Sequence, residues 1–555
     1  MVVRRPRLLA GVACVLSALY LLAALSAMWL HAPRVPYADG WRYIAVLADA
    51  PFLNGVLMVS NGHREVLPNI VRWLDLRLFG ASQLLQIVIG IALLLATLAV
   101  LWRPLARLTP LARAAAYLWA IIGLCWLGNA RALAHAQESV HAYLVTLALV
   151  CGAALLAGAP RDRRDAWGRG LLAGGCGLVA TFSFGSGVAC FGAFLIVLWL
   201  RRASWRDAVP VLACAALAAL SLAIAGVGDE RIQLAPLVQG ERLLRWLAAP
   251  SLYAAWPLLD PEIAARLPLA PLRAIVLPVA EGISGVTGPA HVARWPHLLT
   301  GAFGAVWLVF ASIRCRHAPT PPVVTGLGVA WFAVGVGGLI ALARLGYFEL
   351  YPEQLLASRY VVWSSLFWAG LVYAWIAGAR STATPLIAIV VAVLLIPSQL
   401  WMWRYAERLQ QVASPVATAA AVGVLDPALP LGENVIGEVR TALMPLQARG
   451  AAMHAWPETR WLGRRPNADA THAVDPGELT VSTFDNLLSP GEAARRVEFA
   501  VPSMHVERWL LQDEDGTVRG LAIPDPLDAQ RAIGWMYGTA ETPPRVLVLH
   551  DPGRL

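Results

Sequence analysis

Residues 8–30 read LLAGVACVLSALYLLAALSAMWL, and residues 36–43, a few positions later, read PYADGWRY. Arg4, Arg5 and Arg7 precede the apolar run. A run of this length can cross the hydrocarbon core of a bilayer as a helix. It is also longer than the apolar core of a typical signal peptide. We therefore expect a retained first membrane span with a polar segment directly after it.

The composition extends this pattern to most of the chain. The 555 residues are 58% hydrophobic, only 14% are charged, and the mean hydropathy is +0.60. A soluble protein carries charge on nearer a quarter of its residues. We predict an all-α polytopic membrane protein with about eleven transmembrane helices. They are expected near 8–30, 83–102, 112–127, 140–158, 170–183, 185–200, 208–226, 298–313, 322–342, 360–379 and 385–402.

The net charge of +9 comes from arginines in the short loops between apolar runs. This is the positive-inside pattern of membrane proteins, not the charged stripe of a nucleic-acid-binding surface, so no nucleic-acid partner is predicted. The rule places the N-terminus in the cytoplasm of a multi-pass protein of the bacterial inner membrane. The periplasmic side then receives loops at 31–82, 128–139, 227–297 and 343–359.

The C-terminal segment differs from the rest of the chain. Charges return after about residue 403, and apolar residues alternate in strand-like runs at 497–501, 509–511 and 545–550. Asp513–Gly516 is typical of a hairpin turn between strands. We expect a transmembrane domain over 1–403 and a small periplasmic domain of α/β or β type over 404–555.

The polar segment after the first span carries a carboxylate, Asp39, with Arg42 and Tyr43 close behind it. One interpretation is a helix N-cap, since Asp39 precedes the helix-like stretch 41–50. The other interpretation is that Asp39 takes part in chemistry at the membrane surface. A further polar group, His63 and Arg64, lies in the same loop, and residues 64–80 have the amphipathic spacing of an interfacial helix.

Three features of this loop carry a family resemblance: Asp39 just after the first span, the Arg42–Tyr43 pair, and Leu78–Phe79–Gly80 at a helix end. Together they resemble the GT-C superfamily of membrane glycosyltransferases, which includes protein O-mannosyltransferases and lipid A aminoarabinose transferases. The resemblance covers about 80 residues. Two positions depart from it: Gly40 follows Asp39 where a second acid is usual, and residues 61–68 lack the proline pair often found there.

The resemblance implies a GT-C-like fold and transfer of a sugar from a polyprenyl-phosphate-linked donor. Asp39 would act as general base, and Arg42, Tyr43, His63 and Arg64 would bind substrate. The superfamily often has a second carboxylate in the next periplasmic loop, where Gln137 and Glu138 lie. Gln137 would bind substrate and Glu138 would be the second catalytic residue, although an acid there also suits the first turn of a helix.

Arg359, at the periplasmic mouth of the expected tenth span, could hold the phosphate of a lipid-linked donor. The alternative is an arginine that fixes the helix end at the interface, which is our expectation for Arg344. Expected partners are the lipid-linked sugar donor and a glycan, lipid or protein acceptor. A glycan polymerase or ligase, and a transporter or flippase for a lipid-linked glycan, are the alternative functions.

The sequence contains none of the nucleotide-binding or hydrolase motifs that would indicate another enzyme class. The histidines at 63, 135 and 141 lack metalloprotease spacing, and the seven cysteines form no CxxC pair. We therefore predict no metal centre, while the sequence leaves open whether a divalent cation assists.

Overall fold

The computed structural model describes residues 4–60, 63–224, 236–287, 294–431, 433–467, 469–501, 507–538 and 542–549. The chain divides into two compact units. The first unit comprises Met1–Leu30, Leu57–Pro68 and Ile87–Ala406, and the second comprises His31–Val56, Asn69–Gln86 and Glu407–Leu555.

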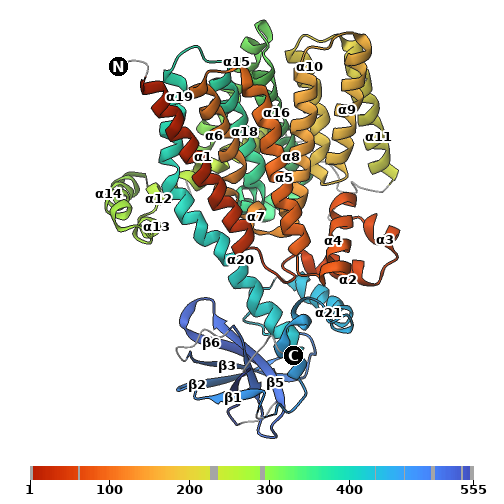
Figure 1. Ribbon diagram of the computed structural model, residues 1–555, viewed down its shortest axis with the longest axis vertical. Helices are drawn as coiled ribbons and strands as arrows, with labels where there is room; N and C mark the ends of the chain where they lie inside the picture. Colours follow the sequence, from red (N-terminus) through yellow and green to blue (C-terminus); the bar gives the residue numbers. More distant parts are fainter. Residues whose placement is uncertain are drawn as a thin grey trace. The chain divides into compact units, whose positions relative to one another are not determined.

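The first unit is a bundle of helices (Figure 1). Its helices are α1 (Arg4–Leu30), α5 (Leu84–Trp102), α6 (Pro110–Cys125), α7 (Ala130–Ala134), α8 (Ala136–Ala157), α9 (Arg163–Thr181), α10 (Ala189–Leu200), α11 (Val209–Ile224), α12 (Pro236–Leu259), α13 (Pro261–Ala265), α14 (Ala270–Thr287), α15 (Arg294–His317), α16 (Pro321–Ala343), α17 (Leu345–Leu350), α18 (Ser358–Ala377), α19 (Ala383–Leu394) and α20 (Ile396–Val422). The last turns of α20, and the first residues of α5, belong to the second unit.

Eight helices of the described residues are long and apolar enough to cross a membrane: α1, α5, α6, α8, α11, α15, α16 and α18. The pair α19 and α20, bent by 43°, makes nine if it is one span. The chain is thus a multi-pass membrane protein, as predicted, with fewer qualifying spans than the eleven expected. The difference lies at 170–200, where α9 begins with charged residues and α10 has 12 residues. A helix of 12 residues covers only about 18 Å, short of the roughly 30 Å hydrocarbon core.

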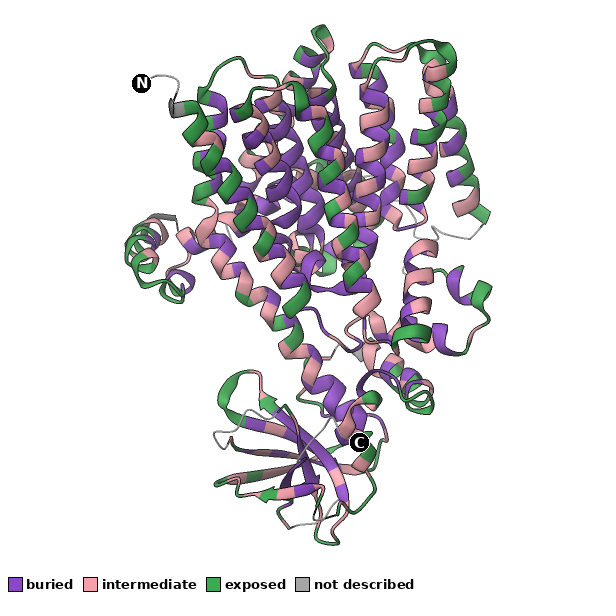
Figure 2. Ribbon diagram, viewed as in Figure 1, coloured by how far each residue is buried: buried purple, intermediate pink, exposed green. Residues whose placement is uncertain are grey.

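Burial separates central from peripheral helices in this unit (Figure 2). The most apolar windows around α6 and α18 are each 83% buried, whereas that of α11 is 22% buried. Leu217 and Leu220 on α11 and Phe303 on α15 are exposed apolar side chains. On spans of this composition such side chains face lipid, so α11 and α15 lie at the edge of the bundle.

The expected loop 227–297 is largely helical where it is described. It contains α12, α13 and α14, while residues 227–235 and 288–293 lie outside the described residues. A small apolar core forms between these helices and α20, from Ala264, Leu267, Val276 and Ala280, with Trp401 packed against it. The loop is therefore an ordered element with its own packing.

The second unit combines a β-sheet with short helices. The helices are α2 (Gly40–Asp49), α3 (Phe52–Val56), α4 (Val66–Phe79, from Asn69 onward) and α21 (Glu433–Ala448). The strands are β1 (Thr471–Val474), β2 (Leu479–Asp485), β3 (Ala493–Ala500), β4 (Trp509–Gln512), β5 (Val518–Asp525), β6 (Asp528–Tyr537) and β7 (Arg545–Leu549). α2 and α4 match the helix-like stretches expected at 41–50 and 64–80.

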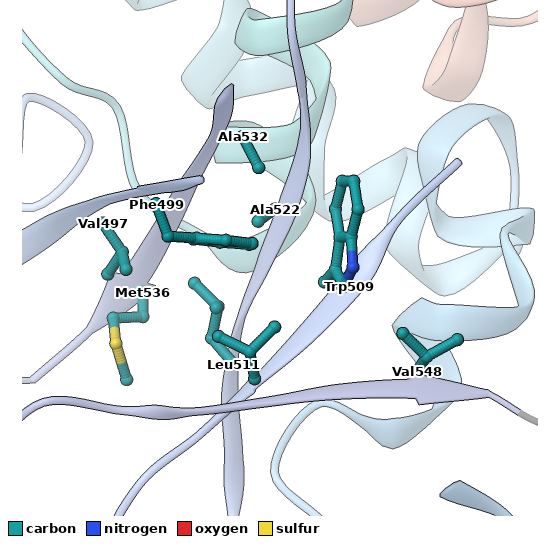
Figure 3. Close-up of a cluster of buried hydrophobic side chains, with 9 residues drawn as sticks. Val497, Phe499, Trp509, Leu511, Ala522, Ala532, Met536 and Val548 are labelled. Carbon is teal, nitrogen blue, oxygen red and sulfur yellow. The ribbon is translucent and has the colours of Figure 1, made fainter. Parts of the chain in front are cut away.

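The seven strands form one antiparallel sheet in the order β1-β7-β4-β5-β6-β3-β2 (Figure 1). Its core contains Val497, Phe499, Trp509, Leu511 and Met536 (Figure 3). The turn at 513–516 joins β4 to β5, with Gly516 at φ +82°. The prediction of a small C-terminal domain with β-structure is confirmed, and the three strand-like runs correspond to β3, β4 and β7, with His550 outside the described residues.

Candidate functional site

The first turn of α8 carries a largely buried carboxylate with two basic partners. Oε1 of Glu138 accepts hydrogen bonds from Nε of Arg131 at 2.6 Å and lies 3.1 Å from Nδ1 of His135. The Glu138 side chain is 15% exposed and that of His135 is 2% exposed. Because the break between α7 and α8 falls at His135, residues on both sides of it meet at one carboxylate. Glu138 is therefore held in one orientation by a cation and an imidazole.

An aromatic stack lies one turn further along α8. Phe184 stacks on His141 with ring centroids 4.3 Å apart and an interplanar angle of 8°. Trp363 of α18 lies near-parallel to the same phenyl ring at 6.3 Å, and His63 packs against it at 4.9 Å. Rings from the first loop, α8, the α9–α10 turn and α18 thus gather at one point of the first unit.

The sequence Phe182–Ser–Phe–Gly185 explains how Phe184 reaches this point. The helix α9 ends at Thr181, and the carbonyl of Phe182 accepts a hydrogen bond from the backbone of Leu67 at 3.2 Å. A Cβ atom at position 185 would lie 2.2 Å from Nδ1 of His63. Glycine at position 185 lets the His63 imidazole approach the backbone of the turn closely. The turn and the first loop therefore pack directly against each other.

The N-terminal end of α18 carries an arginine and tyrosine cluster. Arg359 donates a hydrogen bond to the hydroxyl of Tyr347 at 3.1 Å, and its guanidinium lies 5.0 Å from the ring centroid of Tyr360. Arg344 donates to the hydroxyl of Tyr360 at 3.0 Å. Trp363 follows Arg359 by one helical turn, so the cation and the aromatic stack share a face of α18.

The other face of α18 lines an apolar cavity of about 550 Å³. Several of its lining residues are exposed on the outside of the bundle, including Phe303, Ile387 and Leu394. Helices α6, α12, α15, α18 and α19 form its wall, and the tryptophans among its lining residues are Trp119, Trp126, Trp307, Trp368 and Trp375. Because the exposed residues lie on apolar helices, the cavity opens toward the lipid phase.

One hydrogen bond connects the wall of this cavity to the segment that bears the polar cluster. Ser365, which lines the cavity, donates to Oδ1 of Asn129 at 2.9 Å. Asn129 is fully buried and immediately precedes α7, which carries Arg131. The apolar cavity and the Arg131–Glu138 pair are therefore linked through one buried amide.

In the second unit, Asp39 forms an ion pair with Arg42 at 3.4 Å, and Arg42 also donates from Nε to Oε1 of Glu438 on α21 at 2.6 Å. The side chain of Asp39 is 47% exposed. Asp39 occupies the N-cap position of α2, yet within the described residues its side chain makes no capping hydrogen bond. The pairing with Arg42, rather than helix capping, is the interaction that the structure assigns to this carboxylate.

The electrostatics of Arg42 follow from this pairing. Partial burial would lower the pKa of the Arg42 guanidinium. The hydrogen bond to Glu438 and the charges of Asp39 and Glu438 outweigh that effect, so the pKa of Arg42 lies above its ordinary value. Arg42 is therefore a permanent cation that contacts both Asp39 and Glu438.

A smaller cavity of about 130 Å³ lies in the second unit, and residues on both sides of Asp39 in the sequence line it. Pro36, Tyr37, Ala38 and Trp41 line one side of it, and residues of α20 and of the segment before and within α21 line the other. Ala38, the residue before Asp39, has φ +48°, a conformation that is unusual outside glycine. The residue with positive φ is thus adjacent in sequence to Asp39 and lines the cavity.

The remaining predicted residues lie in varied settings. Tyr43 is 4% exposed, and the guanidinium of Arg72 covers its ring at 3.8 Å from the centroid, so its ring is part of the packing of the second unit. Gln137 is buried beside Glu138 on α8. His63 joins the aromatic stack, and Arg64 follows it, partly buried. The first unit thus holds His63, Arg64, Gln137, Glu138 and Arg359, and the second holds Asp39, Arg42 and Tyr43.

Sequence reasoning missed Glu438, Phe184 and Trp363. Glu438 lies 396 residues from Arg42, and no periodicity pairs positions so far apart. Phe184 lies between two expected spans, and nothing in the sequence pairs it with His141 or Trp363. Nothing in an apolar run such as 360–379 distinguishes the one tryptophan that faces a polar cluster.

Within the described parts of the chain, no group of three or more His, Cys, Asp or Glu side chains could hold a metal ion.

Comparisons with known proteins give no match at the sequence level. No family model matches the chain, and no curated protein matches it.

Three solved structures are similar to parts of this chain. One is the archaeal oligosaccharyltransferase AglB from Archaeoglobus fulgidus in complex with an inhibitory peptide and a dolichol-phosphate, with 13% identity and a TM-score of 0.37 over 77% of this chain and 59% of that one. A second is a crystal structure of the Archaeoglobus fulgidus oligosaccharyltransferase in complex with Zn and sulfate. Its sequence identity to this chain is 12% and its TM-score is 0.35, over 76% of this chain and 56% of that one. The third is ArnT from Cupriavidus metallidurans in the apo state. Its sequence identity to this chain is 12% and its TM-score is 0.35, over 94% of this chain and 99% of that one.

The chain thus spans a little more than half the length of the archaeal enzyme, and nearly the whole length of ArnT. Both are membrane glycosyltransferases of the class that the first loop resembles. At these identities and scores the likeness does not assign an activity to this chain.

Proposed function

We propose that this protein is an integral membrane glycosyltransferase that moves a sugar from a polyprenyl-phosphate-linked donor to a periplasmic or lipid-linked acceptor. The observation that carries the proposal is the 550 Å³ apolar cavity open to lipid, within the unit that also holds Arg359 and the Arg131–Glu138 pair. Its volume falls in the range of ordinary ligand sites. An apolar cavity with charged groups on neighbouring elements suits an amphiphile with an isoprenoid chain and an anionic head.

The donor phosphate needs a cation, and Arg359 is our candidate. Its guanidinium can donate two parallel hydrogen bonds to phosphate oxygens. Its partners within the first unit include tyrosine hydroxyls and rings, and these groups do not neutralise its positive charge. Arg64 of the same unit would assist. When the sugar leaves, Arg359 would neutralise the charge that develops on the phosphate.

The chemical step needs a base for the acceptor hydroxyl, and Asp39 is our candidate. The hydroxyl proton passes to the Asp39 carboxylate as the oxygen bonds to the anomeric carbon, and the bond from that carbon to the phosphate oxygen breaks. The side chain of Asp39 is half-exposed, as a group that meets an incoming substrate should be. Glu138, already bound by Arg131 and His135, is better suited to orienting the acceptor than to taking its proton.

In this proposal residues 1–403 form the transmembrane domain in the bacterial inner membrane, with the N-terminus cytoplasmic and residues 404–555 periplasmic. The acceptor is a cell-envelope glycan, a lipid or a protein. Comparing lipopolysaccharide and surface glycoproteins of a deletion strain with those of the parent would identify it. A change in one class alone names the acceptor, and no change in either contradicts the proposal.

The direct test is Asp39→Asn. We expect sugar transfer from polyprenyl-phosphate donors in isolated membranes to fall by about 10²–10⁴-fold, the usual contribution of a general base. Asp49→Asn is the matched control, because Asp49 lies on the same helix, is exposed and pairs with Arg449 at 3.6 Å. Near wild-type transfer by a normally inserted Asp39→Asn protein would rule out the base assignment.

A further inference from the structure

The turn from α10 to α11 contacts the ends of two other helices of the first unit. Arg201 donates a hydrogen bond to the carbonyl of Leu156, near the end of α8. Nη2 of Arg202 lies 3.4 Å from Nδ1 of His317, the last residue of α15. The ends of α8, α10 and α15 and the start of α11 therefore meet at this turn.

Basic and aromatic side chains gather where these helices meet. The guanidinium of Arg316 lies 4.7 Å from the ring centroid of Trp199, and that of Arg206 lies 5.7 Å from the ring centroid of Trp205. The two tryptophans are 42% and 73% exposed. Within the described residues, neither of these arginines nor Arg202 forms an ion pair with a carboxylate. The guanidinium charges are therefore available to an anion from outside the protein.

The carboxylate of the turn, Asp207, interacts with the backbone. Its Oδ2 accepts a hydrogen bond from the backbone N–H of Ser204 at 3.1 Å, and Oγ of Ser204 accepts one from the backbone N–H of Arg206 at 3.3 Å. This capping box fixes the conformation of the turn. Arginines 201, 202 and 206 of the turn, against this one carboxylate, leave an excess of positive charge.

The backbone at Arg202 has a conformation that is unusual for a residue other than glycine. Its φ is +57°, its N–H donates to the carbonyl of Trp199, and the N–H of Ala203 donates to the carbonyl of Leu198, each at 3.0 Å. This hydrogen-bond pattern ends a helix in the left-handed region, where glycine is the usual residue. Because arginine is strained there, the turn presents a guanidinium at a cost in backbone stability.

Exposed apolar side chains continue from the turn along two helices. Leu212, near the start of α11, is 48% exposed, and Ile313, one turn before the end of α15, is 53% exposed. Tryptophan and arginine at the end of a membrane helix lie at the level of the lipid headgroups. A ligand that matches this surface has an anionic head and apolar chains, which is the chemistry of an acidic phospholipid.

We propose that Arg202, Arg206 and Arg316, with the indoles of Trp199 and Trp205, form a binding site for the phosphate headgroup of an anionic phospholipid. The guanidinium groups hold the phosphate oxygens. The acyl chains lie along the apolar surfaces of α11 and α15. The site is independent of the proposed sugar transfer, so either proposal can fail while the other stands.

The first experiment measures the binding of phosphatidylglycerol to the full-length protein in detergent by native mass spectrometry. Arg206→Gln and Arg316→Gln should each raise the Kd by about tenfold or more, because each removes hydrogen bonds to a charged group. Phosphatidylcholine, which has no net charge, should bind the wild-type protein more weakly by a similar factor. Equal Kd values for the two lipids would overturn the proposal.

Arg380→Gln is the matched control, because Arg380 is an exposed arginine in another turn of the same unit, between α18 and α19. It should leave the Kd for phosphatidylglycerol unchanged. A loss of affinity equal to that of Arg206→Gln and Arg316→Gln would show that only the total charge of the protein matters, and would overturn the assignment of a site.

Arg202→Gly separates lipid binding from folding. Without added lipid, its thermal midpoint should equal or exceed that of the wild-type protein, because glycine adopts this φ without strain. The gain in midpoint on adding phosphatidylglycerol should be smaller than in the wild type, because a weaker ligand stabilises less. A purely structural Arg202 would give a lower midpoint and an undiminished gain, which contradicts the proposal. The measurements on Arg206→Gln and Arg316→Gln decide the matter if Arg202→Gly does not fold.

Inorganic phosphate distinguishes a lipid from a free anion. At the same concentration of phosphate groups it should not displace phosphatidylglycerol, because it has no chains to cover Leu212 and Ile313. Displacement at equal concentration would assign the surface to a soluble phosphate compound and overturn the proposal of a lipid site.

Discussion

At the scale of single residues, the partners of each carboxylate separate the two catalytic candidates. Glu138 is bound by Arg131 and His135 in a largely dry environment, so its geometry is fixed before substrate arrives. Asp39 is half-exposed and forms an ion pair with Arg42 at 3.4 Å. A fixed carboxylate suits orientation of a substrate and an accessible one suits proton transfer, which is why we assign these roles in that order.

Arg359, in the first turn of α18, provides a prediction at this scale. Arg359→Gln should raise KM for a polyprenyl-phosphate donor by about 10- to 100-fold, because a hydrogen bond to a charged group contributes roughly 1.5–3 kcal/mol. The measurement is steady-state kinetics in detergent with a synthetic donor. Arg344→Gln is the control, since Arg344 holds the hydroxyl of Tyr360. Equal increases in KM for both variants would mean that Arg359 only supports the helix end.

At the scale of elements, the break between α9 and α10 brings Phe184 to the site. Two helices, α9 with 19 residues and α10 with 12, replace the single long span that an unbroken apolar run would form. The turn between them fits tightly, since a Cβ at Gly187 would lie 2.0 Å from the carbonyl oxygen of Ala180. Because that contact is with backbone, no side-chain rotation can relieve it.

Gly187→Ala should therefore destabilise the protein by about 1–3 kcal/mol, the usual effect of overpacking. Thermal unfolding in detergent, followed by size-exclusion chromatography, would measure it as a lower midpoint and a smaller folded fraction. Gly192→Ala on α10 is the matched control, because a Cβ there meets nothing within 4 Å. The control should be neutral or slightly stabilising, since alanine favours helix over glycine. Equal midpoints for the two variants would show that the turn is not constrained as described.

At the scale of the whole molecule, the apolar cavity is a product of assembly. Five helices contribute its wall, and their segments are spread from Trp119 to Leu395. Each helix by itself has an ordinary apolar surface, and only their packing leaves space between them. Its exposed apolar lining residues, such as Phe303 and Leu394, make the cavity accessible to lipid.

Filling that space should interfere with long-chain donors. Ala254→Phe places a phenyl ring in the cavity wall on α12. We expect KM for a long-chain polyprenyl donor to rise severalfold while KM for a short-chain analogue changes little, because only the long chain needs the volume. Ala219→Phe on α11 is the control, as that position is exposed and outside the cavity. An equal effect on both donors would indicate that the cavity does not hold the isoprenoid chain.

The sequence alone predicted the class of the protein and most of its helices. These predictions rest on local properties, which can be read directly from the sequence. The properties are apolar runs near 20 residues, arginines in short loops and the return of charge after residue 403. The first loop likewise indicated Asp39 and Arg42 as neighbours, since they lie three residues apart on one helical turn. The count of spans was less certain because α10 is short and α9 is rich in glycine and charge at its start.

Only the tertiary structure decided which distant residues meet. Arg42 with Glu438, Phe184 with His141 and Trp363, and Ser365 with Asn129 join segments that no periodicity relates. The physical reason is that a membrane helix offers many equivalent apolar faces, and packing of the complete bundle selects among them. The pattern of residues therefore determined where the chain is helical and apolar, whereas packing determined which few polar side chains share a site.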